Sequence, residues 1–283
     1  MLNNNQQKGF LKLPNDSIVK TIAVATSLCL VCSLLVSVAA VVLKPLQVEN
    51  KLLDRKQNIL RVAGIEDSSQ TIDELFQQIE TRVVDMQTGE YTDAVDAHSY
   101  DQFKASKDPA YRVKLSRQQD IAKIGGRAKY ASVYLVKNND RLDKIIIPIR
   151  GYGLWSTLFG FLALESDATT VSGITFYDHK ETPGLGGEIE NRNWQASWQG
   201  KQLVNPQGQV VLGLIKGKVV PNSAQSPYQI DGLAGASLTS RGVSNLIQFW
   251  VGENGFGPYL ERIRKQHREA VSILPLGKLS SEG

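Results

Sequence analysis

The stretch Asp231-Gly232-Leu233-Ala234-Gly235-Ala236-Ser237-Leu238-Thr239-Ser240 combines three hydroxyl side chains, two glycines and one carboxylate. A helical pattern follows at once, because apolar residues recur at steps of three and four residues through Val243, Leu246, Ile247 and Trp250. The N-cap of this helix is expected to be Ser237, Thr239 or Ser240. A helix start presents unpaired N–H groups and the positive end of the helix dipole, so it favours a phosphate. Taken alone, the stretch is more simply explained as an ordinary turn and N-cap.

The order of residues resembles the flavinylation motif Asp-x-x-Ser-Gly-Ala-Thr-x-Thr, found in proteins that carry FMN on a threonine through a phosphoester. Four positions match, namely Asp231, Gly235, Ala236 and Thr239. Ala234 stands where the motif usually has Ser, and Ser237 where it usually has Thr. The last threonine of the motif is the attachment point. The resemblance therefore places a flavin on Thr239, with Ser237 as the alternative position.

An uncharged segment of 23 residues runs from Thr21 to Leu43, and 18 of these residues are apolar. As a helix it would be roughly 34 Å long, which is enough to cross a hydrocarbon core. Lys20 and Lys44 flank it and can reach the two membrane interfaces. The alternative is a cleaved signal peptide ending near Val38-Ala39-Ala40, but the apolar run exceeds the roughly 7–15 residues of a signal core. We expect a retained transmembrane helix over residues 21–43.

Charge does not decide the orientation of this helix. Three lysines precede the segment and five basic residues follow within about twenty positions, so a simple count would keep the large domain in the cytoplasm. Long domains, however, cross membranes largely regardless of nearby charge. The orientation is left open by the residues themselves.

Cysteine usage and overall charge exclude several classes of protein. The two cysteines, Cys29 and Cys32, both lie in the apolar segment, so the rest of the chain has no disulfide framework. They read as two small apolar residues of a membrane helix, the alternative being a redox or metal pair. A net charge of +4 with no aromatic-basic stripe argues against nucleic-acid binding. Three histidines argue against a histidine-based metal site.

The remaining pattern predicts an α+β domain carried on a single N-terminal transmembrane helix. The first soluble helix is expected over Leu46–Val62, with a stop at Ala63-Gly64. A second helix is expected to begin at the capping box Thr71-x-x-Glu74 and to include Ile79. Two further helices are expected over residues 241–251 and over Tyr259–Ala270. Hairpin-like strand pairs are expected at Ala131–Val136 with Leu142–Ile149 and at Thr157–Leu164 with Val171–Tyr177, and a further strand at Gln209–Ile215. The sheet is therefore expected to be mixed or antiparallel, with no strand order implied.

These elements suggest five consecutive regions. They are a polar N-terminus (1–20), the transmembrane helix (21–43), a helical and mixed membrane-proximal region (44–128), the ligand-binding domain (129–258), and a C-terminal helix and tail (259–283).

Two further segments follow predicted strands and have the composition of binding loops. They are Gly151-Tyr152-Gly153-Leu154-Trp155-Ser156 and His179-Lys180-Glu181-Thr182-Pro183-Gly184-Leu185-Gly186-Gly187. Glycines let a ligand approach the backbone, and an indole can stack on a flat ring. Each segment alone is equally well explained as a turn, and His179 is expected to have a surface or capping role.

Together, the three segments resemble the FMN-binding domain of two related families. These are the C subunit of the sodium-translocating NADH:quinone oxidoreductase and the G subunit of the Rnf electron-transport complex. The resemblance to the former covers nearly the whole chain and includes the lysine-flanked anchor and the segments at 58–64, 153–156 and 188–191, with Trp194.

The resemblance implies a redox subunit with covalent FMN, acting within a membrane complex and not catalytic alone. A flavin transferase would attach the FMN to Thr239, and electrons from NADH would pass towards ubiquinone, coupled to Na⁺ export. NADH and quinone would bind on the other subunits. The large domain would lie on the periplasmic side of a bacterial inner membrane, with a single membrane pass. No metal is implied in this chain.

The resemblance also suggests roles for residues around the flavin. Ser237 and Leu238 would hold the phosphate, while Asp231 would brace the loop or serve during flavin transfer. Trp155 and Leu185 would flank the ring, and the polar edge of the ring would be lined by Glu181, Thr182 and Gly184.

Three other functions remain open from the residues alone. An Rnf-type subunit would have the same chemistry with another electron source. A membrane-anchored envelope binding module would carry no cofactor. A serine hydrolase is the weakest alternative, because no histidine partner can be named for any serine.

Overall fold

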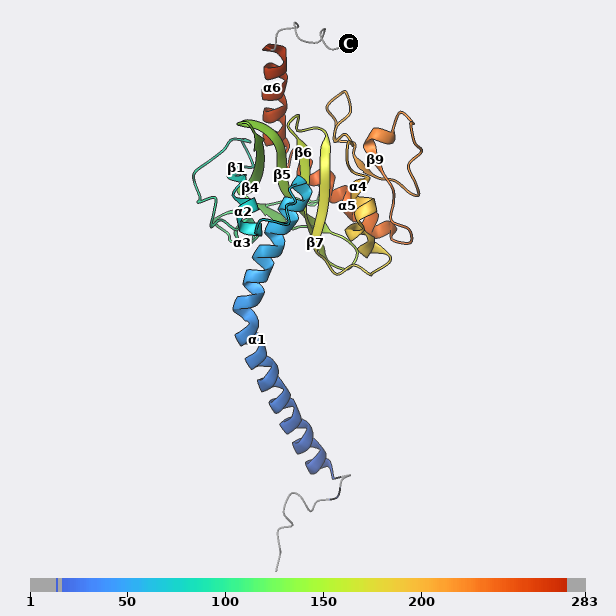
Figure 1. The fold of residues 1–283 in the computed structure, drawn as a ribbon. Helices are drawn as coiled ribbons and strands as arrows, with labels where there is room; N and C mark the ends of the chain where they lie inside the picture. Colours follow the sequence, from blue (N-terminus) through green and yellow to red (C-terminus); the bar gives the residue numbers. More distant parts are fainter. Residues whose placement is uncertain (1–13, 15–16, 274–283) are drawn as a thin grey trace, which may run out of the picture. The chain divides into compact units, whose positions relative to one another are not determined.

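The computed structural model describes Pro14 and residues 17–273, and it divides into two compact units, one ending at Leu53 and the other beginning at Asp54. The helix α1 (Ile18–Ala63) contributes residues to both units (Figure 1). The expected polar N-terminus and C-terminal tail fall largely on residues outside the described range.

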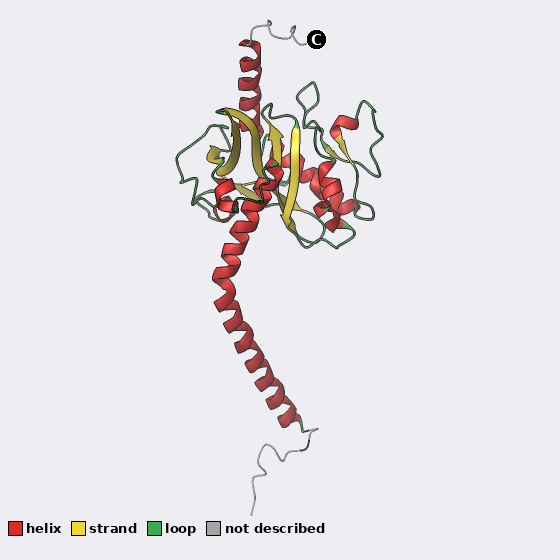
Figure 2. Ribbon diagram, in the orientation of Figure 1, coloured by secondary structure: helices red, strands yellow, loops and turns green. Residues whose placement is uncertain are grey.

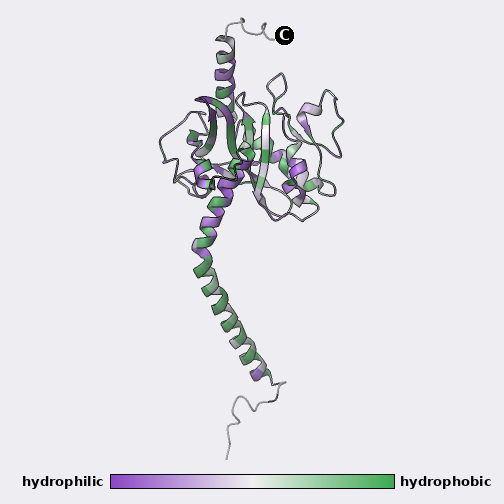
Figure 3. Ribbon diagram, in the orientation of Figure 1, coloured by the Kyte–Doolittle hydropathy of each residue, from purple (hydrophilic) through white to green (hydrophobic). Residues whose placement is uncertain are grey.

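In the first unit, α1 is long and apolar enough to cross a membrane. No other helix among the described residues meets both conditions. None of its most apolar 18-residue window is buried against the protein. Figure 3 shows the hydrophobic colouring along this part of the helix. An apolar helix without protein cover needs an apolar solvent, so the expected N-terminal membrane helix is present as a candidate span.

The prediction of two separate helices around Pro45 is wrong. Pro45 lies inside α1, which continues for 46 residues. A proline removes one backbone hydrogen bond, and a long cooperative helix tolerates this loss. The predicted stop is confirmed: α1 ends at Ala63, Gly64 has a φ of 74°, and the Ile65 N–H donates to Leu60 O at 3.0 Å, as in a Schellman motif.

The second unit is built on a five-stranded antiparallel sheet with the strand order β1-β4-β5-β6-β7. The strands are β1 (Ile79–Asp85), β4 (Tyr130–Asn138), β5 (Arg141–Tyr152), β6 (Thr157–Glu165) and β7 (Val171–Asp178) (Figure 2). Both predicted hairpins are confirmed. Asn139 and Asp140, at φ 50° and 60°, form the two-residue turn between β4 and β5, as in a type I′ hairpin.

The two faces of the sheet are covered by different helices, because neighbouring residues of a strand point to opposite faces. Ile146, on β5, packs with the end of α1 (Ile59–Ala63) and with Leu75. Its neighbours Ile145 and Ile147 pack on the other face, which α5 (Ser237–Val251) and α6 (Gly257–Ile273) cover. Each of these fully buried side chains contributes about 1.5–3 kcal/mol.

The helix predicted from the capping box is shorter than expected. Thr71 and Glu74 form the box, and α2 spans only Ile72–Phe76. The prediction that Ile79 belongs to this helix is wrong, because Ile79 is the first residue of β1 and pairs with Val136. A five-residue helix has little stability of its own, so tertiary pairing of the following residues decides its end. The sheet thus takes its first strand from the region expected to be membrane-proximal.

The polar region before β4 holds a short helix α3 (Gln102–Ala105) and a two-stranded ladder. The ladder joins β2 (Arg112–Lys114) antiparallel to β3 (Gly126–Ala128). The sequence pattern did not predict these elements, since each is too short to show a period.

The chain after β7 contains short elements before the two final helices. They are η2 (Gly186–Glu190), α4 (Arg192–Ala196), β8 (Gly213–Leu214), η3 (Ser226–Tyr228) and β9 (Gln229–Ile230). The strand predicted over Gln209–Ile215 is wrong in extent, because only Gly213 and Leu214 form a strand, parallel to β9, and Val210 forms an isolated bridge with Val204. Helix α5 begins at Ser237 and α6 spans Gly257–Ile273, so both predicted helices are confirmed with earlier starts. The glycine-rich stop after α5 is also confirmed, because Gly252 is its C-cap.

Candidate functional site

The candidate site lies where the N-terminus of α5 meets the loops that follow β5 and β7. The prediction of a hydroxyl N-cap is wrong. Ala236 is the N-cap of α5, with no side-chain hydrogen bond to the helix, and Ser237, Thr239 and Ser240 lie in its first turn. Ser240 has a different task, since its Oγ accepts the Leu233 N–H at 3.0 Å. The absence of a side-chain cap leaves the start of α5 available to an acceptor from outside the helix.

Thr239 points into the protein towards Glu181. Its Oγ1 donates to Glu181 Oε2 at 2.7 Å, and its side chain has no exposed surface. Glu181 is 5% exposed. The structure therefore brings together the attachment residue of the motif and a residue of the loop after β7, 58 positions away.

The second carboxylate oxygen of Glu181 organises the loop after β5. Its Oε1 accepts the N–H groups of Leu154 and Trp155 at 3.0 and 2.9 Å, and that of Ser156 at 3.3 Å. Burial alone raises the pKa of Glu181, but the hydrogen bonds from Thr239, Trp155, Leu154 and Ser156 outweigh it and hold the pKa below its usual value. Glu181 is thus an ionised carboxylate that joins three segments.

Two glycines allow this approach of loops and helix. A Cβ at Gly186 would lie 2.6 Å from Thr239 Oγ1 and 2.8 Å from Glu181 Oε2. A Cβ at Gly242, inside α5, would lie 2.5 Å from Tyr152 O. Sequence reasoning treated Gly186 as one of several loop glycines and missed Gly242, although a glycine within a helical pattern is itself an indication of close backbone contact.

Solvent-exposed apolar side chains come from the same segments that meet at Glu181. Among the described residues of the second unit, nine large apolar side chains are exposed, and five come from the end of β5 and the loop after it, the loop after β7 and the start of α5. They are Tyr152, Leu154, Trp155, Leu185 and Leu238. Trp155 is 65% exposed and Leu238 54%. Exposed apolar patches of this kind mark binding surfaces.

Asp231 lies outside the Thr239–Glu181 contact. Its Oδ1 accepts the Val219 N–H at 2.7 Å and its backbone O accepts Trp194 Nε1 at 3.0 Å. These bonds connect the start of the motif to the 217–220 loop and to α4.

Thr182 and Gly184 form the exposed turn of the loop after β7. Thr182 O accepts the N–H groups of Leu185 and Gly187 at 3.1 and 2.9 Å, and Gly184 has a φ of 73°. Such a φ favours glycine. Leu185 reaches back towards α5, because a Cβ at Gly235 would lie 2.9 Å from Leu185 Cδ2.

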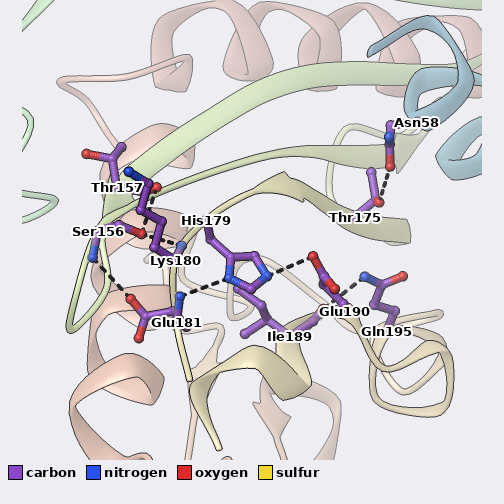
Figure 4. A network of polar contacts seen from close by, with 10 residues as sticks. All are labelled: Asn58, Ser156, Thr157, Thr175, His179, Lys180, Glu181, Ile189, Glu190 and Gln195. Atoms are coloured by element: carbon purple, nitrogen blue, oxygen red, sulfur yellow. Dashed lines mark hydrogen bonds and ion pairs between the residues drawn. The ribbon is translucent and has the colours of Figure 1, made fainter. Parts of the chain in front are cut away.

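His179 has a capping contact, as the sequence predicted. Its Nδ1 accepts the Glu181 N–H at 3.1 Å, and its Nε2 lies 2.9 Å from Glu190 Oε1 as an ion-pair contact without hydrogen-bond alignment. Ser156 Oγ, which sequence reasoning missed, accepts the Lys180 N–H at 2.7 Å. Figure 4 shows how these residues surround Glu181. His179 and Ser156 therefore hold the backbone that aims the carboxylate.

Comparison with known proteins places this arrangement in a family. The FMN-binding domain family matches residues 153–252, which contain Glu181, Thr239 and all of the three segments except Gly151 and Tyr152. The C subunit of the Na⁺-translocating NADH-quinone reductase from Pseudomonas aeruginosa is 50% identical over 254 residues, covering 88% of this chain and 97% of that protein. The corresponding protein from Vibrio vulnificus is 49% identical over 251 residues, with the same coverage of both chains. This chain belongs to that family of C subunits.

Solved structures agree with this family. The crystal structure of Shewanella oneidensis NqrC has a TM-score of 0.69 at 29% identity and covers 74% of this chain and 96% of that one. The C subunit from Parabacteroides distasonis has a TM-score of 0.58 at 25% identity, covering 78% and 96%. The expected architecture, an apolar N-terminal helix followed by a mixed α/β FMN-binding domain, is confirmed.

The residues present fit FMN on three physical grounds. The start of α5 has no side-chain cap, so its first N–H groups suit a phosphate. The exposed side chains of Trp155, Leu185 and Leu238 supply apolar surface for a flat ring. The hydroxyl of Thr239 is oriented by its hydrogen bond to the carboxylate of Glu181.

Proposed function

We propose that this chain is the member of a Na⁺-translocating NADH:quinone oxidoreductase complex that carries FMN covalently on Thr239. The observation that carries the proposal is the contact of 2.7 Å from Thr239 Oγ1 to Glu181 Oε2 at the uncapped start of α5. Bound FMN supplies the ability to accept and release single electrons, on a route from NADH towards ubiquinone. The family relatives are named as subunits of such a reductase, which supports the assignment.

The chain's own residues have separate tasks in this function. Glu181 accepts the hydrogen bond of the Thr239 hydroxyl and orients it at the start of α5 until a flavin transferase acts. Ser237, Leu238 and the first N–H groups of α5 hold the phosphate.

Other site residues hold the ring and the loops. Trp155 and Leu185 flank the ring, with Thr182 and Gly184 at its edge. Asp231 braces the motif through Val219. Because Thr239 has no exposed surface, the loop after β7 has to move away from it before a flavin transferase can act.

A phosphoester leaves the ring electronics nearly unchanged, so its benefit is retention of the cofactor. Retention is needed most where lost FMN cannot be recaptured, and we place the domain on the periplasmic side of a bacterial inner membrane. The other subunits bind NADH and quinone and form the sodium path, since a lone α1 helix offers no route for an ion.

In-gel fluorescence under ultraviolet light tests the covalent cofactor directly. The chain is expressed with its flavin transferase and run on an unstained denaturing gel. We expect a fluorescent band at 31.2 kDa plus FMN, and a peptide carrying FMN at Thr239. A dark band in the presence of active transferase would favour the cofactor-free binding module. Co-purification with components of an Rnf complex would favour the Rnf-type alternative.

The orientation has its own test, because the chain has no cysteine after Cys32. A Lys180→Cys variant, with both native cysteines replaced by Ala, carries a single exposed thiol in the domain. We expect a membrane-impermeant maleimide to label it in spheroplasts. Labelling only after lysis would place the domain in the cytoplasm.

A further inference from the structure

A small cavity lies near the other end of α5, away from the Thr239 site. It is lined by residues of α3, β3, the start of β4 and the end of β5, together with Met86 and Trp250. Its volume of about 10 Å³ leaves room for a single small particle, such as one water molecule or one monatomic ion. Sulfate, phosphate and organic ligands are therefore too large for it.

Two buried arginines, Arg127 and Arg150, line this cavity, and each is only 9% exposed. Arginine is rarely buried to this extent unless an opposite charge accompanies it. Among the described residues, neither guanidinium has a carboxylate at ion-pair distance. Asp85 and Asp120 act on them from farther away, and both oxygens of Asp120 already accept the N–H groups of Ile124 and Gly125.

Neutral groups satisfy only part of the two guanidinium groups. Arg127 Nη1 donates to Ala128 O at 3.1 Å, and Arg150 Nη2 donates to Ser106 Oγ and Gly126 O at 3.0 and 2.9 Å. The Phe103 ring lies 5.5 Å from Arg150 Cζ. Each guanidinium has five N–H donors, and Arg127 Nε is buried with no acceptor.

The acceptors on the cavity wall are few and occupied. Gln102 Oε1 accepts the Ser132 N–H at 3.0 Å, and the Tyr130 carbonyl accepts the Tyr100 hydroxyl at 3.0 Å. A water molecule accepts about two hydrogen bonds and needs acceptors for its own two protons. A monatomic anion accepts from several donors and needs no acceptor. The surplus of donors thus favours an anion over water.

The electrostatic environment points the same way. Burial lowers the pKa of Arg127 and of Arg150, and the distant carboxylates of Asp85 and Asp120 offset this effect only in part. Uncompensated positive charge in a region of low dielectric is costly.

We propose that this cavity binds one monovalent monatomic anion, a halide such as chloride, between Arg127 and Arg150. The ion neutralises buried charge and ties β3 to the end of β5, whose Arg150 backbone O also accepts Trp250 Nε1 at 2.6 Å. The site is independent of the flavin assignment.

Thermal unfolding of the full-length chain in detergent tests the proposal. The melting temperature is measured in sodium bromide, chloride and gluconate at equal ionic strength. We expect it to rise with bromide or chloride and to reach a plateau, but not with gluconate. In Arg127→Met the halide dependence should disappear, while the exposed-site control Arg141→Met should keep it. Equal melting temperatures in halide and gluconate, or an unchanged halide dependence in Arg127→Met, would overturn the proposal.

A second measurement covers the case in which Arg127→Met fails to fold. Crystals of the unaltered chain grown in bromide are measured at the bromine absorption edge. An anomalous peak within hydrogen-bond distance of Arg127 Nε and Arg150 supports the site. A well-defined cavity without such a peak overturns it.

Discussion

Thr239 Oγ1 and Glu181 Oε2 lie 2.7 Å apart, and both side chains are almost completely buried. One residue opens helix α5 and the other follows strand β7. The hydroxyl that the motif assigns to flavin attachment is thus engaged with a carboxylate that also holds the loop containing Trp155. Changes at this contact are expected to affect both flavin attachment and stability.

Thr239→Val should abolish covalent flavin, because valine has nearly the same shape but no hydroxyl. It should also destabilise the domain by about 1–3 kcal/mol, since Glu181 Oε2 loses its donor in a buried position. Thr239→Ser should keep the hydrogen bond in the flavin-free protein and should still become flavinylated. In-gel fluorescence measures the attachment, and urea unfolding of the flavin-free proteins measures the stability.

The comparison variant is Ser237→Ala, which removes the alternative attachment hydroxyl two residues away. It should keep the covalent flavin, because the first N–H groups of α5 still hold the phosphate. Covalent flavin in Thr239→Val that is lost in Ser237→Ala would move the attachment to Ser237.

The stability of the domain should depend on pH through Glu181. Because the folded-state pKa of Glu181 is lowered, its contribution is complete above the unfolded pKa of about 4.3 and is lost as the pH falls through the folded value. Glu181→Gln should lower the melting temperature at neutral pH and make it fall less between about pH 6 and pH 3. Melting curves of both proteins check this.

Glu66→Gln is the control for this pH series, because Glu66 is exposed. Its melting temperatures should follow those of the unaltered chain throughout. Parallel pH curves for Glu181→Gln and the unaltered chain would show that Glu181 does not carry the effect.

Gly186→Ala should disrupt the Thr239–Glu181 contact, because the new Cβ would lie 2.6 Å from Thr239 Oγ1. We expect a destabilisation of about 1–3 kcal/mol and reduced flavin incorporation. Gly213→Ala is the control, since its Cβ would meet nothing closer than Ser244 Oγ at 3.5 Å. Equal flavin yield from both variants would contradict the proposed packing.

Trp155→Ala should leave stability within about 0.5 kcal/mol, because the side chain is 65% exposed. If Trp155 flanks the flavin ring, the visible absorption and fluorescence of the attached FMN should change. Val220→Ala removes another exposed side chain, at 68% exposure, and should leave the spectrum unaltered. Identical spectra for the two variants would exclude contact between Trp155 and the ring.

The end of α1 should be held to the sheet by one buried hydrogen bond. Thr175 Oγ1 donates to Asn58 Oδ1 at 2.9 Å, and the two residues are 1% and 2% exposed (Figure 4). A double-mutant cycle with Thr175→Val and Asn58→Leu should give a coupling of roughly 0.5–3 kcal/mol. Thr157→Val, on neighbouring β6, is the control and should show no coupling to Asn58→Leu.

Elements with a strong local pattern were predictable from the sequence. The uncharged run 21–43 predicts a long apolar helix. The turn residues Asn139 and Asp140 predict a hairpin. Pro45 and Ile79 show the limit of such reasoning. Proline usually ends a helix, but at Pro45 the cooperativity of the long helix α1 outweighs this preference. Ile79 has the spacing of a helical residue, but its pairing with Val136 places it in a strand.

The sequence by itself determined three local features, because each depends on neighbouring residues. They are a helix start that favours a phosphate, a glycine-rich loop and a loop that contains a tryptophan. Only the tertiary structure decided that Glu181 faces Thr239 and that Gly186 makes room for the contact. It also decided that Arg127 and Arg150 share a cavity. Side chains far apart in the chain meet through the order of strands in a sheet, and that order depends on the free energy of the whole domain, which no single stretch encodes.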